Sequence, residues 1–122
     1  MIPAENPKDR IANRKPPLNL WPPAATILGS LAMAEGAKKY GAYNWRSKRV
    51  LMTVYIAAIQ RHLAALADGE DCDTDSQAPH LGHILACAAI LADAQAGGWL
   101  EDDRPPAGPA AALLALHTTP YG

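Results

Sequence analysis

The sequence predicts an all-α fold, and three observations support this prediction. Apolar residues make up 49% of the 122 residues, yet aromatic residues make up only 6% and phenylalanine is absent. A core of Ala, Leu and Ile suits closely packed helices better than a sheet. Three long stretches show helical spacing of apolar residues, and each stretch is followed by glycine. We expect a single domain, because the chain is too short for two independent cores.

The first 17 residues differ in character from the rest of the chain. They mix charged residues with four prolines, which predicts an extended N-terminal arm without regular structure at residues 1–17. Residues 18–122 then form the single all-α domain. Its first helix covers residues 24–40, because Leu28, Leu31 and Glu35 share one face and Gly41 supplies a stop.

The second long helix follows an ordered, aromatic loop at residues 41–48. Ser47 in this loop could cap the helix. The helix is expected over residues 50–68, with His62 on its apolar stripe and Gly69 at its end.

An acidic loop at residues 70–78 leads into the third long helix. Pro79 fits its first turn, and the helix runs to about residue 96, before two glycines. One more short helix is expected at residues 110–117. The apolar stripes are more extensive than three such helices can bury against one another, so we expect a helical bundle completed by oligomerisation.

The overall charge argues against large anionic partners. The formal net charge is −1, which gives no reason to expect a nucleic acid or a membrane surface as a partner. No apolar run approaches the roughly 20 residues that span a bilayer. The N-terminal segment is polar and the chain has only two cysteines, so we expect a cytoplasmic protein.

Glu35 is the strongest single candidate for a catalytic or metal-binding residue. An ionised carboxylate on an apolar helix face is costly unless it is paired or bound to a metal ion. The alternative is an ion pair with Lys38 or Lys39 one turn further along the helix, and the sequence leaves both possibilities open.

A second group of candidates lies around the acidic loop. Glu70, Asp71 and Asp73 follow the helix that carries His62, and hard cations such as Mg²⁺ or Mn²⁺ prefer oxygen ligands. A solvated acidic loop and a hydrogen-bonded core histidine are the alternatives. A structural zinc site is a further possibility, built from two histidines and two cysteines, namely Cys72, His80, His83 and Cys87.

Aromatic and basic residues near the first helix are suited to a nucleotide. Trp21 and Trp45 flank this helix and could stack on a base. Local positive charge for a triphosphate comes from Lys38, Lys39, Arg46, Lys48, Arg49 and Arg61, although solvated surface cations are the more common case.

Five separated sequence blocks carry a resemblance to a known family. They are EGAKKYG at 35–41, NW at 44–45, RHL at 61–63, GED at 69–71 and HLGH at 80–83. In this order they resemble the phage dATP/dGTP diphosphohydrolases, which are relatives of the MazG-like all-α nucleotide pyrophosphohydrolases. The resemblance runs from about residue 18 to residue 93 and implies a MazG-like fold and a homotetramer.

The resemblance also implies a metal site with Mg²⁺ or Mn²⁺. In the wider superfamily the ligands come from Glu-x-x-Glu on one helix and from Glu-x-x-Asp further on. Here the motifs correspond to Glu35 and to Glu70 with Asp73, so these three residues are the expected metal ligands. The chain departs from the pattern in two ways, because Lys38 replaces the second glutamate and the second motif falls at a helix end.

The implied reaction converts dGTP and dATP to dGMP and dAMP with release of pyrophosphate, in a phage pathway that places 2-aminoadenine in DNA. Alternatives are a non-catalytic helical oligomer that binds nucleotide or zinc, and a related enzyme for pyrimidine or damaged nucleotides. The expected catalytic residues are Glu35, Lys38, Lys39 and Arg61, and the expected substrate-binding residues are Trp21, Asn44, Trp45, His62 and His83.

Overall fold

The computed structural model describes residues 5–120 and confirms the all-α fold. Within these residues the α-helices are α1 (Pro7–Ala12), α2 (Pro23–Tyr40), α3 (Met52–Ala67), α4 (His80–Gly97) and α5 (Ala110–Leu116). Shorter elements are the 3₁₀ turns η1 (Leu18–Leu20) and η2 (Asn44–Arg46) and the strands β1 (Val50–Leu51) and β2 (Leu100–Glu101).

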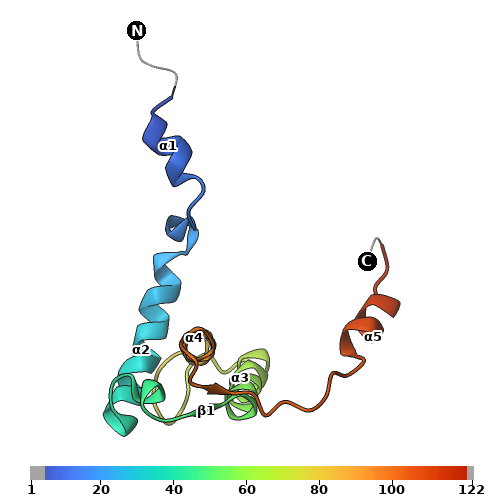
Figure 1. Cartoon of the computed structure of the whole chain (residues 1–122). Helices are drawn as coiled ribbons and strands as arrows, with labels where there is room; N and C mark the ends of the chain where they lie inside the picture. Colours follow the sequence, from blue (N-terminus) through green and yellow to red (C-terminus); the bar gives the residue numbers. More distant parts are fainter. Residues whose placement is uncertain (1–4, 121–122) are drawn as a thin grey trace.

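Helix α4 lies at the centre of the molecule, and α2 and α3 pack on different sides of it (Figure 1). Small residues make this close approach possible, since Ala32 of α2 and Ala86 and Ala94 of α4 are buried. At Gly82 a Cβ atom would overlap the backbone carbonyl oxygen of Leu28 on α2. Glycine at this position therefore sets how closely α2 and α4 approach each other.

The ends of the three long helices lie within two residues of the predicted boundaries. Gly41 follows α2 with φ 91° and Gly69 follows α3 with φ 94°, a backbone region that favours glycine. These two helix ends could be predicted from the sequence because glycine readily adopts the positive φ found after each helix.

The start of the second helix was predicted two residues too early. Val50 and Leu51 form β1, which pairs in parallel with β2 in the register Val50 with Leu100 and Leu51 with Glu101. Val50 is only 3% exposed, so this pairing contributes to the core. Ser47 does not cap α3, because its hydroxyl donates to the carbonyl of Asn44 at 3.0 Å.

The prediction of an N-terminal arm without regular structure is wrong for residues 7–12, which form α1. The side chain of Asn6 caps this helix by accepting a hydrogen bond from the backbone N–H of Lys8 at 2.9 Å. Pro7 suits a first helical turn because its missing N–H would have no partner there. Residues 1–4 of the predicted arm lie outside the described residues.

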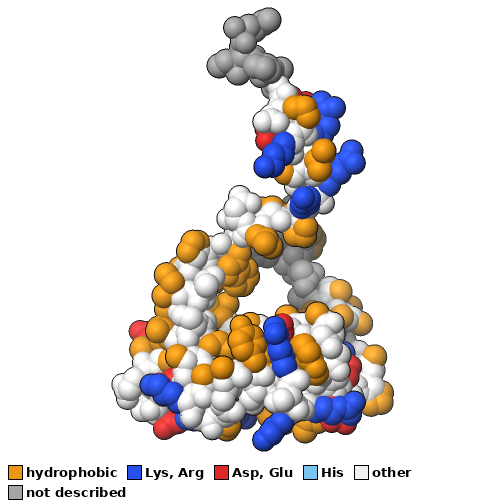
Figure 2. Space-filling view, turned by 60° about the vertical axis from the view of Figure 1, so that its left-hand side comes forward, with side chains coloured by type: hydrophobic (Ala, Val, Ile, Leu, Met, Phe, Trp, Pro, Cys, Tyr) orange, Lys and Arg blue, Asp and Glu red, His pale blue; other side chains and the backbone are white. Residues whose placement is uncertain are grey.

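Few large apolar side chains are buried, and several are conspicuously exposed. Leu18 is 82% exposed and Leu20 is 75% exposed, and the buried apolar residues are one valine and four alanines. Figure 2 shows hydrophobic side chains spread over one face of the molecule, with Lys and Arg side chains gathered on α1. Among residues 5–120, none of the helices has the length and apolar character needed to cross a membrane.

Candidate active site

A pocket of about 730 Å³ lies beside α2, α4 and the turn that contains η2. This volume is in the range of sites that enclose small organic ligands. Five residues predicted for the site line it, namely Glu35, Lys39, Asn44, Trp45 and His83. The structure thus brings together predicted residues from three separate parts of the chain.

One wall of the pocket is held by Asp93 of α4. Its carboxylate accepts hydrogen bonds from the indole N–H of Trp45 at 2.7 Å and from the Nε and Nη2 groups of Arg46, each at 2.9 Å. The bonds from Arg46, followed by the bond from Trp45, lower the pKa of Asp93. The guanidinium of Arg46 also lies 4.5 Å from the centre of the Tyr43 ring. These contacts fix the aromatic turn against α4.

Glu35 and the two lysines of α2 have different positions. The carboxylate of Glu35 is half-buried and lies 3.5 Å from the ammonium of Lys38, so the predicted alternative of an ion pair is present. Lys39 lines the pocket and lies 3.4 Å from Asp75. Neither Lys38 nor Arg61 is part of the pocket lining. Glu35 remains the carboxylate of α2 that borders the pocket.

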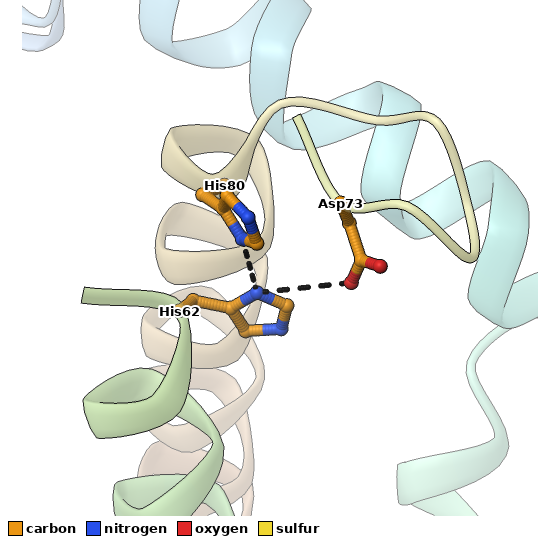
Figure 3. Close-up of side chains that lie close together, drawn as sticks. All are labelled: His62, Asp73 and His80. Atoms are coloured by element: carbon orange, nitrogen blue, oxygen red, sulfur yellow. Dashed lines mark hydrogen bonds and ion pairs between the residues drawn. The ribbon is translucent and has the colours of Figure 1, made fainter. Parts of the chain in front are cut away.

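Three histidines gather at the end of the pocket where α3 and α4 meet. The Nδ1 atoms of His62 and His80 lie 2.8 Å apart, and the ring of His62 stacks on the ring of His83 with centres 4.5 Å apart. We call His62, Asp73, His80 and His83 the histidine cluster. Figure 3 shows His62, Asp73 and His80 pointing toward one another from α3, the connecting loop and α4. His83 belongs both to this cluster and to the pocket lining.

Asp73 is placed by the loop that joins α3 to α4. Its carboxylate accepts the backbone N–H of Asp75 at 2.8 Å, and this hydrogen bond is the main reason why the pKa of Asp73 is lowered. Its Oδ2 atom lies 3.9 Å from His62 Nδ1 and 3.9 Å from His83 Nε2. An ionised carboxylate therefore faces the imidazole rings.

The histidines themselves are positioned by hydrogen bonds and burial. Burial is the main cause of the lowered pKa of His62, and the neighbouring His83 and His80 lower it further. A lowered pKa favours the neutral ring, which keeps a nitrogen lone pair for a ligand. His80 Nε2 lies 2.9 Å from Glu70 Oε1, and His83 Nε2 lies 2.7 Å from the hydroxyl of Ser76.

The residues that could hold a metal ion differ from the predicted set. The ligand atoms of His62, Asp73 and His80 all lie within 4.8 Å of one another, and residues 5–120 contain no other such group of three. Glu35 lies outside this group, and Glu70 contacts it through His80. Two imidazoles and a carboxylate form a donor set that suits a divalent metal ion.

The structure does not support the alternative zinc site. Cys72 and Cys87 are both free, and neither belongs to a group of three potential ligands among the described residues. Cys72 is exposed in the loop, where its backbone bridges to Pro79, and Cys87 is half-buried on α4. The four proposed ligands therefore do not converge on one point.

Trp21 is a predicted substrate-binding residue that lies outside the pocket lining. It precedes α2, whereas Glu35 lies 12 residues beyond the start of that helix, or about 18 Å at a rise of 1.5 Å per residue. Its side chain is 59% exposed and is not part of the lining.

Sequence reasoning missed Asp93 and assigned His80 only to the zinc alternative. Asp93 is 48 residues from Trp45, so no local spacing links the two residues. His80 and His83 are three residues apart, which places both side chains on one face of a helix. This spacing could have indicated a pair of histidines at one site. It could not show that His62 of another helix would contact them.

Comparison with known proteins shows to which family the chain belongs. A family model described as "dATP/dGTP diphosphohydrolase, N-terminal" matches residues 5–104, which include the whole pocket and the histidine cluster. No curated protein matches the chain, and no solved structure does. Since the match covers most of the 122 residues, the chain belongs to the dATP/dGTP diphosphohydrolase family.

Proposed function

We propose that this protein hydrolyses dATP and dGTP to dAMP and dGMP with release of pyrophosphate, in the presence of Mg²⁺ or Mn²⁺. The observation that carries the proposal is the pocket, which combines an aromatic wall, a carboxylate and a lysine within the part of the chain that matches the family. These are the three kinds of group that a nucleotide with a metal-bound triphosphate requires.

The aromatic wall is suited to the purine base. Trp45 is held by Asp93, and the rings of Trp45 and Tyr43 lie 5.3 Å apart, so the wall is ordered before a ligand enters. A purine can stack on such rings, and the side-chain amide of Asn44 can both donate to and accept from its edge. We assign base binding to this wall of the pocket.

Two charged residues of the pocket lining are suited to the phosphates. Lys39 supplies positive charge, and Glu35 is placed to hold a divalent ion that accompanies the triphosphate. A bound divalent ion neutralises phosphate oxygens and lowers the pKa of a bound water. Asp73 lies 3.9 Å from His83, which lines the pocket, and this supports its predicted role near the metal. Lys38 and Arg61 need a change of side-chain position to reach the phosphates.

In the proposed reaction, water attacks the α-phosphorus. The water oxygen bonds to this phosphorus while its bond to the oxygen that bridges to the β-phosphate breaks, so pyrophosphate leaves in one step. We propose that this reaction removes dATP and supplies dGMP in a phage pathway for 2-aminoadenine DNA, and that the enzyme works as a homotetramer.

The bond that breaks can be identified with isotopically labelled water. Incubation of dGTP, Mn²⁺ and enzyme in water enriched in the heavy oxygen isotope should give labelled dGMP and unlabelled pyrophosphate. Label in pyrophosphate would show attack at the β-phosphorus, and dGDP with orthophosphate would show attack at the γ-phosphorus; either result contradicts the proposal.

A panel of triphosphates tests the proposed substrates. dATP and dGTP should be hydrolysed much faster than dCTP and dTTP. Faster hydrolysis of a pyrimidine nucleotide would contradict the assignment of the aromatic wall to purines. Binding of dGTP without any release of pyrophosphate would instead identify a non-catalytic nucleotide-binding protein.

A further inference from the structure

Three of the chain's four histidines meet two carboxylates where α3, the loop and α4 come together. His80 is only 4% exposed, and the side chains of His62 and His83 are 18% and 17% exposed. Burying this many titratable groups together is costly unless they share a ligand or a complete set of hydrogen bonds. We propose that His62, Asp73 and His80 form a binding site for one divalent transition-metal ion, which the protein binds without nucleotide.

The geometry of the three side chains fits a single ion. The Nδ1 atoms of His62 and His80 lie 2.8 Å apart, and Asp73 Oδ2 lies 3.9 Å from His62 Nδ1. Two ligands at about 2.0 to 2.2 Å from an ion are at most about 4.4 Å apart. All three ligand atoms already lie within 4.8 Å of one another, so small side-chain rotations complete the site (Figure 3).

Glu70 orients one of the ligands. In the neutral form of His80, the Nε2–H group donates to Glu70 Oε1 at 2.9 Å, and the lone pair of Nδ1 then points at His62 and Asp73. Histidine ligands commonly donate their second ring N–H to a carboxylate, which fixes the ring and strengthens the ligand. Glu70 is therefore a positioning residue in this site, whereas its sequence motif predicted a direct ligand.

The donor set determines the class of ion. Imidazole nitrogen suits Zn²⁺, Fe²⁺ and Ni²⁺ and binds Mn²⁺ less tightly than these ions, whereas Mg²⁺ strongly prefers oxygen ligands and retains its water molecules. Both cysteines lie outside the group, so the site is not a thiolate zinc site. Three protein ligands leave coordination positions open, and His83 connects the site to the pocket.

This inference goes beyond the proposed hydrolysis and does not depend on it. A bound ion would join the end of α3, the loop and the first turn of α4, since each of these segments contributes one ligand. The site should then load in the absence of dATP or dGTP and raise the temperature of unfolding.

Calorimetric titration of the metal-free full chain with Mn²⁺, Zn²⁺ and Mg²⁺ tests the site directly. We expect one Mn²⁺ or Zn²⁺ per chain, bound at least about tenfold more tightly than Mg²⁺. His62→Gln and His80→Gln should each weaken Mn²⁺ binding by at least about 100-fold, and Glu70→Gln by about 10- to 100-fold. His117→Gln, which changes the exposed fourth histidine after α5, is the matched control and should bind like the wild type.

Pulsed electron paramagnetic resonance of the Mn²⁺ complex adds a readout that folding defects do not mimic. Coupling of Mn²⁺ to ¹⁴N in the wild type should disappear or halve in His62→Gln. Equal affinity for Mg²⁺, absence of nitrogen coupling, or unchanged affinity in His62→Gln would overturn the site. If His80→Gln loses its helical circular dichroism, the site is tested by the Mn²⁺ affinity of His62→Gln and by the nitrogen coupling in the wild-type spectrum.

Glu35→Gln separates this inference from the proposed hydrolysis. Glu35 lies outside the ligand group, so the variant should keep the nitrogen-ligated ion while losing release of pyrophosphate. A wild-type protein that binds Mn²⁺ through nitrogen but releases no pyrophosphate would overturn the hydrolysis alone. A protein that hydrolyses dGTP without a nitrogen-ligated ion would overturn the site alone.

Discussion

Glu35 and Asp93 are carboxylates of the same pocket, yet their surroundings suit them to different tasks. Asp93 accepts three hydrogen bonds from Trp45 and Arg46, which occupy most of its acceptor capacity. Glu35 has a single cation, Lys38, at 3.5 Å, so its oxygens remain available to a metal ion. We therefore regard Asp93 as the group that positions the wall and Glu35 as the group that meets the metal-bound phosphates.

The first prediction concerns Glu35. Glu35→Gln keeps the size of the side chain but removes the charge that a divalent ion needs, so release of pyrophosphate from dGTP should fall by orders of magnitude. Circular dichroism should stay unchanged. The control is Glu101→Gln on β2, outside the pocket lining, which should keep normal activity. Near-normal turnover of Glu35→Gln would contradict its role.

The second prediction concerns the acid range of stability. Because the pKa of Asp93 is lowered in the folded state, its ionised form stabilises the fold fully above about pH 4, the value of an unperturbed aspartate, and less as the pH falls toward the lowered pKa. The stability difference between wild type and Asp93→Asn should therefore shrink below about pH 4. Urea unfolding followed by tryptophan fluorescence measures it.

The control for this prediction is Asp9→Asn, which changes an exposed carboxylate on α1. Its stability difference from the wild type should show no comparable change in the same pH range. A difference for Asp93→Asn that stays constant down to pH 3 would show that the contacts with Arg46 and Trp45 contribute nothing through the charge of Asp93.

Individual site residues could be predicted only where the neighbouring sequence already pointed to a functional role. Glu35 stands out because a carboxylate on an apolar stripe is unusual, and Trp45 and Asn44 share a short aromatic loop. The partners of these residues were not predictable, since Asp93 and His80 reach them only through helix packing. Long-range pairs of this kind leave no periodic signal in a single sequence.

At the scale of elements, α4 provides the surface on which α2 and α3 both pack. The long helices could be predicted because proline and glycine mark their ends, and the ends observed lie within two residues of those expected. The parallel pair β1 and β2 could not be predicted. Each strand has only two residues, and the partners Val50 and Leu100 are far apart in the chain.

The third prediction compares two helical glycines. A Cβ atom at Gly82 would overlap the carbonyl oxygen of Leu28, so Gly82→Ala should force α2 and α4 apart and destabilise the protein by about 1 to 3 kcal/mol or more. At Gly36 a Cβ atom meets nothing within 4 Å. Gly36→Ala should therefore stabilise the protein by about 0.5 to 1 kcal/mol.

Thermal unfolding of both variants measures the contrast. The unfolding temperature should move in opposite directions for Gly82→Ala and Gly36→Ala. A Gly82→Ala protein as stable as the wild type would show that the close approach of α2 and α4 is not required.

At the scale of the whole molecule, the single chain leaves much apolar surface uncovered. The exposed large apolar residues include Leu18, Leu20 and Ile27, and the buried apolar residues are mostly alanines. Figure 2 shows many hydrophobic side chains at the surface of the visible face. Exposed apolar patches of this extent are typical of surfaces that bind a partner. The extensive apolar stripes already predicted from the sequence that a single chain would leave apolar surface uncovered. Which surfaces are uncovered could be seen only once the positions of the helices were known.

The fourth prediction follows from this surface. Light scattering at micromolar concentration should give a mass of about four times 12.9 kDa. Ile27→Glu places a charge on an exposed apolar residue and should lower this mass, whereas Lys48→Glu should not change it. A monomeric wild-type protein would contradict the proposed tetramer.

The central position of α4 also has a consequence for how the chain is made. Both α2 and α3 are synthesised before α4, and each finds its main packing partner only when α4 follows. At about 5 to 20 residues per second, the 57 residues between the end of α2 at Tyr40 and the end of α4 at Gly97 take roughly 3 to 11 seconds to synthesise. During this interval the apolar faces of α2 and α3 lack the helix that covers them. The nascent polypeptide is therefore open to the chaperones and proteases of the cell throughout this interval.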